Sequence, residues 1–164
     1  MPVAELHPFV LHFAVALLLS APLCDALGLL LRREPLLQAG RWNTLLGAGS
    51  AALAVVTGLA AEAALGPHSA AGGALLQLHK ALGLVMLAVW IPVAAWRGLS
   101  KMALPQRGRT LYLTAAFAGA AIVLAEAVLG GALVYRHGVG LSAAARAEPT
   151  PHSTTRIPVD HSAR

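Results

Sequence analysis

Four long runs of apolar residues constrain the fold of this chain more than any other feature. The hydrocarbon core of a bilayer is about 30 Å thick, and an α-helix needs about 20 apolar residues to cross it. The first run, from Phe9 to Leu31, reaches this length, and three later runs resemble it. The pattern predicts an all-α fold, an up-down bundle of four transmembrane helices over residues 8–31, 42–65, 75–96 and 111–136.

Composition supports an integral membrane domain. Hydrophobic residues make up 57% of the chain and charged residues only 12%, which is far from the balance of a soluble globular domain. In a soluble protein the net charge of +5 would suggest nucleic-acid binding. Here the basic residues are confined to loops and a tail, so we expect no nucleic-acid partner and attribute them to membrane topology.

The segments outside the runs have the composition of loops and of a tail. Pro35 and Gly40 indicate a short loop over 34–41. After residue 140 the sequence becomes rich in Ser, Thr, Pro and charge, which is typical of disorder. We therefore expect one transmembrane domain over residues 1–140 and a disordered polar tail over residues 141–164.

The basic residues are unequally divided between the two sides of the predicted bundle. Four crossings return the chain to the side on which it started, and two loops on the other side hold most of the Lys and Arg residues. Cytoplasmic loops carry such an excess. The sequence therefore predicts that both termini lie outside, opposite the loops with Arg32, Arg33, Arg41, Arg97, Lys101, Arg107 and Arg109.

The histidines all fall on the outer side of this topology. His12 and His79 lie at similar depths in the first and third helices, which are parallel and can lie diagonally across the bundle. Two imidazoles at one level can hold a haem by both of its axial positions. Gly83, one turn beyond His79, leaves space for the flat macrocycle. We therefore expect His12 and His79 to bind one b-type haem near the outer face.

A line of glycines, an acid and a histidine runs along one side of the fourth helix: Gly119, Glu126, Gly130 and His137. Arg136 and His137 lie at a helix carboxyl end, where positive charge is favoured. We expect these two residues and Lys80 to hold the haem propionates, with His7 and Gly130 at the edge of the same site.

Two other functions fit the same residues. A transition-metal ion such as copper, zinc or nickel suits imidazole, and three or four histidines would bind it. A structural subunit of a membrane complex would use them only to contact partner proteins. Since no Cys-x-x-Cys-His motif is present, a haem would be noncovalent. The histidines considered for a metal ion are His7, His12, His68, His79 and His137.

Charged residues inside the runs need partners, because an unpaired charge in hydrocarbon is costly. Asp25 lies at the cytoplasmic end of the first helix, and we expect it to pair with Arg32, Arg33 or a neighbour in the basic loops. Glu126 lies deeper, so we expect its carboxyl group to be protonated or hydrogen-bonded. Trp90 is expected to anchor the helix at the inner interface.

Three segments resemble those of one family of bacterial membrane proteins, the DUF2231 proteins. They are His7-Pro8-Phe9-Val10-Leu11-His12-Phe13, His79-Lys80-Ala81-Leu82-Gly83 and Gly130-Gly131-Ala132-Leu133-Val134-Tyr135-Arg136-His137-Gly138-Val139-Gly140. The resemblance covers about residues 5–140. Family members usually have a proline directly after the Phe of the first segment, where this chain has Ala14.

The resemblance implies a four-helix domain that is sometimes found beside Rieske or cytochrome domains. Such neighbouring domains favour a redox role in the membrane. Together with the histidines it leads us to expect a multi-pass protein of the bacterial inner membrane. Such a protein would be an electron carrier rather than an enzyme. It would pass single electrons between a quinone or membrane partner and a periplasmic cytochrome or Rieske-type protein. A membrane complex or a second copy of the chain is a further expected partner.

Overall fold

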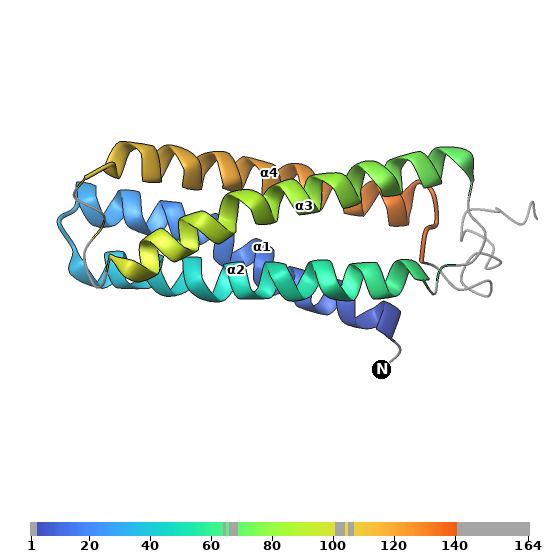
Figure 1. The fold of residues 1–164 in the computed structure, drawn as a ribbon, viewed down its shortest axis with the longest axis horizontal. Coiled ribbons are helices and arrows are strands. Elements are labelled where there is room, and N and C mark those ends of the chain that lie inside the picture. The colour runs from blue at the N-terminus through green and yellow to red at the C-terminus, as the bar shows by residue number, and fades with distance from the viewer. Residues whose placement is uncertain (1–2, 64, 66–68, 101–103, 105–106, 141–164) are drawn as a thin grey trace, which may run out of the picture.

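The computed structural model describes residues 3–63, 65, 69–100, 104 and 107–140, and only the backbone of residues 3–5. It contains four α-helices, α1 (Val3–Leu30), α2 (Glu34–Ala63), α3 (Ala70–Leu99) and α4 (Arg109–Tyr135), shown in Figure 1. Each is long and apolar enough to cross a membrane, and the described residues form no strand. The predicted four-helix transmembrane bundle is therefore confirmed, whereas the tail over 141–164 lies outside the described residues.

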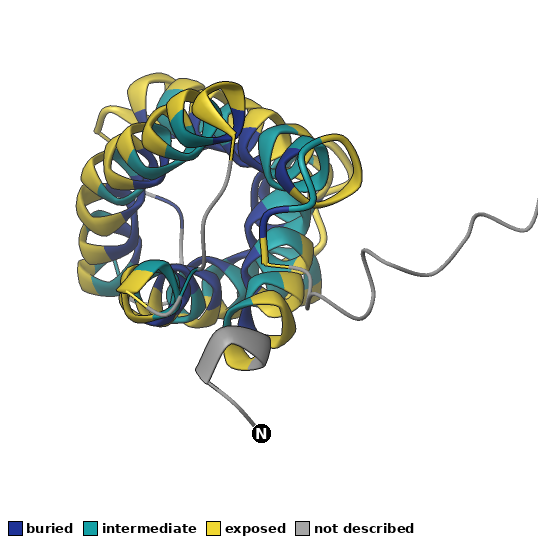
Figure 2. Cartoon of the chain, turned by 90° about the vertical axis from the view of Figure 1, so that its right-hand side faces the viewer, coloured by how far each residue is buried: buried dark blue, intermediate teal, exposed yellow. Residues whose placement is uncertain are grey.

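The helices run alternately up and down, so the chain enters and leaves the bundle at one end (Figure 1). We call this the terminal end, and the opposite end, where α1 joins α2 and α3 joins α4, the loop end. α1 and α3 each pack against α2 and α4. Therefore α1 and α3 lie diagonally, as predicted, and Figure 2 shows the four helices as a ring with their buried sides inward.

α2 begins earlier than the sequence predicts. It starts at Glu34 rather than at Trp42, so the loop expected over 34–41 is helical. A proline is tolerated in the first turn of a helix, and an acidic residue there interacts favourably with the helix dipole. Pro35 and Glu34 therefore start a helix instead of interrupting one.

α3 also begins earlier, at Ala70 rather than at Leu75. The hydroxyl group of Ser69 accepts a hydrogen bond of 3.0 Å from the backbone N–H of Gly72. Such a cap satisfies an N–H group that has no partner within the helix. The cap extends α3 through a Gly- and Ala-rich segment that the sequence alone suggests to be a loop.

Glycines bring α1 and α2 into close contact. A Cβ atom at position 47 would lie 2.6 Å from Cδ2 of Leu18, and one at position 28 would lie 2.6 Å from Cδ2 of Leu37. Small residues allow membrane helices to approach closely and to pack through dispersion forces. The interface between α1 and α2 is accordingly the most extensive in the bundle.

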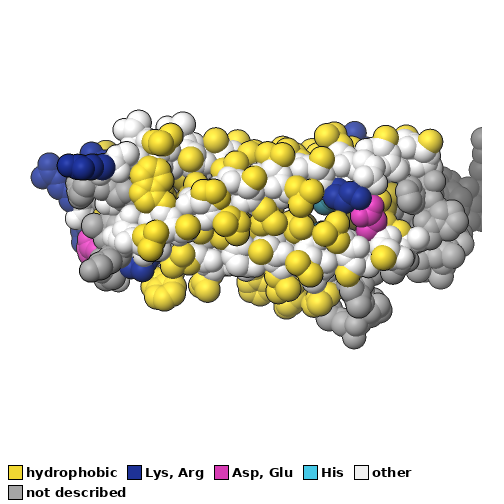
Figure 3. All heavy atoms as spheres, viewed as in Figure 1, with side chains coloured by type: hydrophobic (Ala, Val, Ile, Leu, Met, Phe, Trp, Pro, Cys, Tyr) yellow, Lys and Arg dark blue, Asp and Glu magenta, His cyan; other side chains and the backbone are white. Residues whose placement is uncertain are grey.

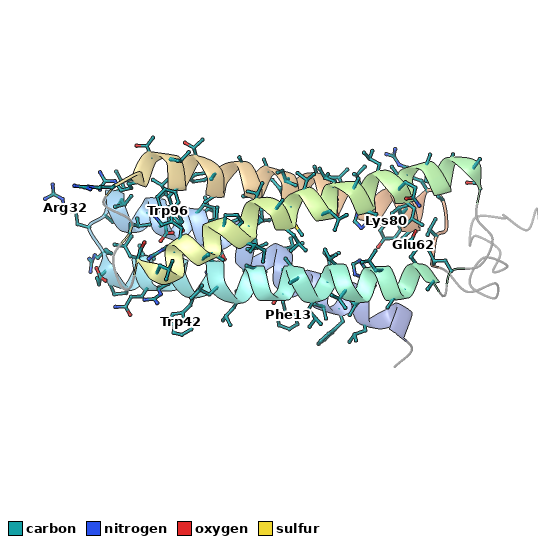
Figure 4. The ribbon with its side chains drawn as sticks, viewed as in Figure 1. Phe13, Arg32, Trp42, Glu62, Lys80 and Trp96 are labelled. Atoms are coloured by element: carbon teal, nitrogen blue, oxygen red, sulfur yellow. The ribbon has the colours of Figure 1, made fainter. Side chains whose placement is uncertain are left out.

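Apolar side chains fill the middle of the bundle. Leu18 and Trp90 are fully buried there. Trp90 is thus not an interfacial anchor, contrary to the expectation from sequence, because Gly119 admits its indole ring: a Cβ atom at 119 would lie 2.8 Å from Nε1. On the outside, Phe13 and Trp42 are exposed and point away from the bundle (Figure 4), as expected of a surface in contact with lipid.

Candidate functional site

A histidine and a buried carboxylate meet across the boundary between α3 and α4. Nδ1 of His79 lies 2.8 Å from Oε2 of Glu126, and the two side chains are 15% and 7% exposed. The distance is that of a charge-assisted hydrogen bond, although the ring N–H is not aligned with it. Oε1 of Glu126 has no hydrogen-bond partner among the described residues. The carboxyl group therefore engages the imidazole on its Nδ1 side, as expected for a buried Glu126.

His7 of α1 supplies a second imidazole. Its Nδ1 lies 2.7 Å from the carbonyl oxygen of Ala54 in α2, so Nδ1 must donate, since a carbonyl group only accepts. The ring centroids of His7 and His79 lie 6.5 Å apart, and the ring planes are inclined by 80°. The two imidazoles thus meet across the diagonal of the bundle with Nδ1 of each ring directed to an oxygen.

Glycines from three helices surround the two rings. A Cβ atom at Gly58 of α2 would lie 3.0 Å from Cε1 of His7, and one at Gly130 of α4 would lie 3.6 Å from Cε1 of His79. Gly83 is buried one turn beyond His79 on α3. The flanking helices α2 and α4 therefore bring glycine backbone close to Cε1 of each ring, while α4 also places Glu126 beside His79.

A polar bridge between α2 and α3 borders this cluster. Nζ of Lys80 lies 2.9 Å from Oε1 and 3.1 Å from Oε2 of Glu62, and Nε2 of Gln77 donates to Oε1 at 3.3 Å. Lys80 and Glu62 point toward each other in Figure 4. In Figure 3 the surface beside them is hollowed, and a histidine side chain is visible there. The bridge thus lies at an opening toward the imidazoles.

His12 does not face His79, which corrects the pair expected from the sequence. The side chain of His12 is exposed, and its Nδ1 lies 2.5 Å from the carbonyl oxygen of Pro8 on the same helix. Five positions separate His7 from His12, and this rotates their side chains about 140° apart around an α-helix. Only one of the two can face the interior, and it is His7.

Helical spacing is the signal that distinguishes the two histidines. The buried residues of α1 recur every three or four positions, as on the inward face of a bundle helix. His7 continues this series toward the amino terminus, whereas His12 lies outside it. The series is Val10, Ala14, Leu18, Ala21 and Asp25.

The line of residues predicted on α4 does face α3. Gly119 lies against Trp90, while Glu126 and Gly130 lie against His79. The seven-residue and four-residue spacings keep these positions on one side of the helix. The prediction of a common face is therefore confirmed for the helical part of the line.

His137 and Arg136 follow the end of α4 at the rim of the bundle. The Cβ atom of His137 would lie 3.4 Å from a Cβ atom at Gly72, so this histidine packs against the start of α3. Arg136 is exposed. Both residues line a groove between α3 and α4, and neither makes a described contact with the two imidazoles.

A second polar cluster is fully buried toward the loop end. Nη2 of Arg97 donates to Oδ1 of Asp25 at 3.1 Å and to the carbonyl oxygen of Leu37 at 2.6 Å. The hydroxyl group of Tyr112 donates to Oδ2 of Asp25 at 2.7 Å. The expectation that Asp25 pairs with a basic neighbour at this end is confirmed, and its partner is Arg97 rather than the arginine pair that follows α1.

The apolar middle of the bundle separates the two polar clusters. Along α4, Tyr112 and Glu126 are fourteen positions apart, which is about 21 Å. Leu18, Met86 and Trp90 belong to the buried apolar core. The cluster around His79 therefore lies on the terminal side of this layer.

The positions of the ring nitrogens define what the cluster can do. A histidine that binds a metal usually donates its other N–H to a carboxylate or a backbone carbonyl, which fixes the ring and makes it a better ligand. His7 contacts Ala54 in this way, whereas Nδ1 of His79 lies 2.8 Å from Oε2 of Glu126 without an aligned N–H group. The described part of the chain has no group of three or more His, Cys, Asp or Glu side chains placed to hold an ion.

Fold and site together define a class: a small multi-pass membrane protein whose four-helix bundle holds a histidine–carboxylate cluster in the half nearer its termini. Within this class the chain belongs to the family described as "Predicted membrane protein (DUF2231)", whose sequence profile matches residues 4–143. The resemblance noted in the sequence is thereby confirmed. Comparisons with curated proteins and with solved structures found no match.

Proposed function

We propose that this protein is a one-electron carrier of the bacterial inner membrane that binds one b-type haem between His7 and His79. The observation that carries the proposal is the pair of half-buried imidazoles from diagonal helices, each with Nδ1 close to an oxygen of a neighbouring helix. This leaves Nε2 of each ring as the ligand atom. Two imidazole ligands occupy both axial positions of the iron, which suits electron transfer better than oxygen chemistry.

The spacing of the rings supports two-sided ligation. Bonds of about 2 Å from each imidazole nitrogen to a metal put the ring centroids about 6 Å apart, and the centroids of His7 and His79 lie 6.5 Å apart. A macrocycle between α1 and α3 extends toward α2 and α4, where Gly58 and Gly130 lie beside the rings. A flat ligand between α1 and α3 would need small residues on α2 and α4, because larger side chains there would occupy its space.

Polar groups at the opening have a role in the same proposal. Lys80 borders the hollow between α2 and α3. We assign it to a haem propionate, which would replace Glu62 as the partner of its ammonium group. Arg136 and His137, expected from the sequence to hold propionates, line a different groove. A periplasmic cytochrome or Rieske-type protein would then approach the terminal end.

The charge distribution supports the proposed orientation. Exposed arginines lie at the loop end, and Figure 3 shows Lys and Arg side chains gathered there. The positive-inside rule assigns this end to the cytoplasm, so both termini and the histidine cluster face the periplasm. Arg97 does not add to the exposed charge, because it is buried with Asp25. The exposed residues are Arg32, Arg33, Arg107 and Arg109.

The same two ring nitrogens also favour a second candidate, a single copper ion. Cuprous copper suits imidazole, and a site with two ligands fits the described residues better than a four-ligand zinc or nickel site does. His68, which the sequence offers as a further ligand, lies outside the described residues.

An absorbance experiment tests the haem proposal. The protein is produced in a haem-replete bacterium, purified in detergent and scanned before and after dithionite. We expect a Soret band and an α-band in the wild type, loss of both bands in His7→Ala and in His79→Ala, and unchanged bands in His12→Ala, since His12 is exposed. His12→Ala is the matched control because it removes the same side chain from the same helix.

Other results overturn the proposal. Bands that survive His7→Ala but vanish in His12→Ala would contradict the ligand pair. A colourless wild type with one copper per chain would establish the copper site instead. A colourless and metal-free protein would leave only a structural role in a membrane complex.

A further inference from the structure

A groove on the outside of α3 and α4 is separate from the histidine cluster. It has a volume of 490 Å³, within the range of about 300–1,000 Å³ typical of small-molecule sites. Two of the residues beside it, Val128 and Tyr135, are 72% and 90% exposed, so the groove opens toward lipid. Its lining consists of Leu75, Val128, Leu129, Gly131, Ala132, Tyr135, Arg136 and His137.

The groove is apolar along the helices and polar at its outer end. Leucine, valine and alanine side chains line its length, whereas Tyr135, Arg136 and His137 line the end nearest the rim. These three side chains can all donate hydrogen bonds. A ligand for such a site is lipid-soluble and carries hydrogen-bond acceptors at one end.

Two consecutive glycines make α4 thin between this groove and the histidine cluster. A Cβ atom at Gly130 would lie 3.6 Å from Cε1 of His79, whereas one at Gly131 would meet nothing within 4 Å. One glycine thus faces the imidazole and the next faces the groove. Leu75 lies one turn before His79 on α3. The glycine backbone of α4 therefore lies between the groove and His79 at this level.

We infer that the groove binds the head of an isoprenoid quinone, with one quinone carbonyl oxygen toward Arg136 and His137 and the ring beside Gly131. The site requires a lipid-soluble ligand, acceptor atoms and closeness to a redox centre, and a quinone meets all three requirements. An anionic phospholipid would pair with the cationic rim of the groove. Its binding would not depend on the short distance between the groove and His79 at Gly130 and Gly131.

The choice of a quinone and the electron exchange rest on the proposed function, whereas the binding of a lipid-soluble acceptor in the groove can be measured without it. Oxidation of one quinol to quinone breaks two O–H bonds and releases two electrons and two protons. Two protein molecules with oxidised haem each take one electron, and both protons pass to water at the terminal end. Each turnover therefore consumes two oxidised carriers and one quinol.

A titration in nanodiscs of phosphatidylcholine tests the binding with a decyl-substituted benzoquinone as the probe. We expect one saturable site in the wild type. Gly131→Leu fills the groove and should weaken binding at least about tenfold, and Arg136→Gln should weaken it by a similar factor, since a hydrogen bond from a charged donor is lost. Leucine favours helix more than glycine does, so Gly131→Leu should keep α4 folded.

Two controls separate this proposal from the haem proposal. Gly49→Leu adds the same side chain on the exposed face of α2, where a Cβ atom meets nothing within 4 Å, and should bind the probe as the wild type does. His7→Ala should lose the haem bands and still bind the probe. A protein that has bands but no quinone site would therefore refute only the groove.

The groove proposal is overturned if the wild type shows no saturable binding or if Gly131→Leu binds like the wild type. It is also overturned if phosphatidylglycerol in the nanodisc displaces the probe and stays bound to the purified protein, because the groove would then be an anionic-lipid site. Slower reduction of haem by the reduced probe in Gly131→Leu, with an unchanged spectrum, is the expected sign that the two sites exchange electrons.

Discussion

Individual glycines in this bundle have different roles, although the sequence does not distinguish them. At Gly40 a Cβ atom would lie 2.3 Å from Oδ1 of Asp25 and 3.2 Å from the carbonyl oxygen of Ala21. At Gly49, on the same helix, it would meet nothing within 4 Å. The first position brings α2 against a buried carboxylate, and the second faces outward.

This difference predicts opposite effects of one substitution. Gly40→Ala should destabilise the bundle by about 1–3 kcal/mol, because the added methyl group overpacks the site of Asp25. Gly49→Ala should leave stability unchanged or raise it by up to about 1 kcal/mol, since alanine favours helix. Thermal unfolding in detergent measures both variants, and equal effects would contradict the close approach at Gly40.

At the candidate site the sequence predicted the kind of residue better than its position. It identified His79, Gly83, Glu126 and Gly130, which lie together, and it expected Glu126 to be hydrogen-bonded. It chose His12 rather than His7, because the apolar run begins near His12 and depth was judged from that run. Which way a helix turns its side chains depends on its neighbours, and in this bundle α2 receives His7 at Gly58 and Ala54.

At the scale of helices, the buried cluster of Asp25, Arg97 and Tyr112 joins three of the four elements and reaches the fourth through the carbonyl oxygen of Leu37. It joins the diagonal pair α1 and α3 near the loop end, as His7 and His79 do nearer the terminal end. All three side chains are fully buried. The cluster therefore sets the register of the helices near the loop end.

Breaking this cluster should be costly. Arg97→Met leaves Asp25 as a buried charge without its cation and should destabilise the bundle by about 3–5 kcal/mol. Arg33→Met, at an exposed arginine of the same end, should change stability by less than about 0.5 kcal/mol. Unfolding of the two variants in detergent gives the comparison.

The double variant Asp25→Leu with Arg97→Met provides the second half of this test. Replacing a buried ion pair by apolar residues of similar size is often close to neutral, so the double variant should recover most of the stability lost in Arg97→Met. A double variant as unstable as the sum of its single changes would show that the two residues do not interact.

At the scale of the whole molecule, the two ends of the bundle differ in charge and in the depth of their polar groups. The loop end has exposed arginines and a sealed polar cluster, while the terminal end has the open histidine cluster and the groove. The apolar middle, including Leu18 and Trp90, separates the two. The proposed electron carrier would exchange electrons at the terminal end.

The asymmetry predicts the topology in the membrane. A reporter enzyme that is active only in the periplasm, fused after Gly140, should be active, and the same reporter placed after Gly108 should be inactive. A reporter that fluoresces only in the cytoplasm should give the opposite pattern at the two sites. Periplasmic activity at position 108 would reverse the orientation that the exposed arginines predict.

The sequence by itself determined the number of helices, their antiparallel order, the diagonal placement of α1 and α3, and the inward line of Gly119, Glu126 and Gly130. These follow from run length and from the 3.6-residue period, which are properties of single helices. Only the tertiary structure decided that His7 rather than His12 meets His79 and that Arg97 is the partner of Asp25. Each of these depends on how one helix is rotated against its neighbours, and that rotation is fixed by contacts between residues far apart in the chain.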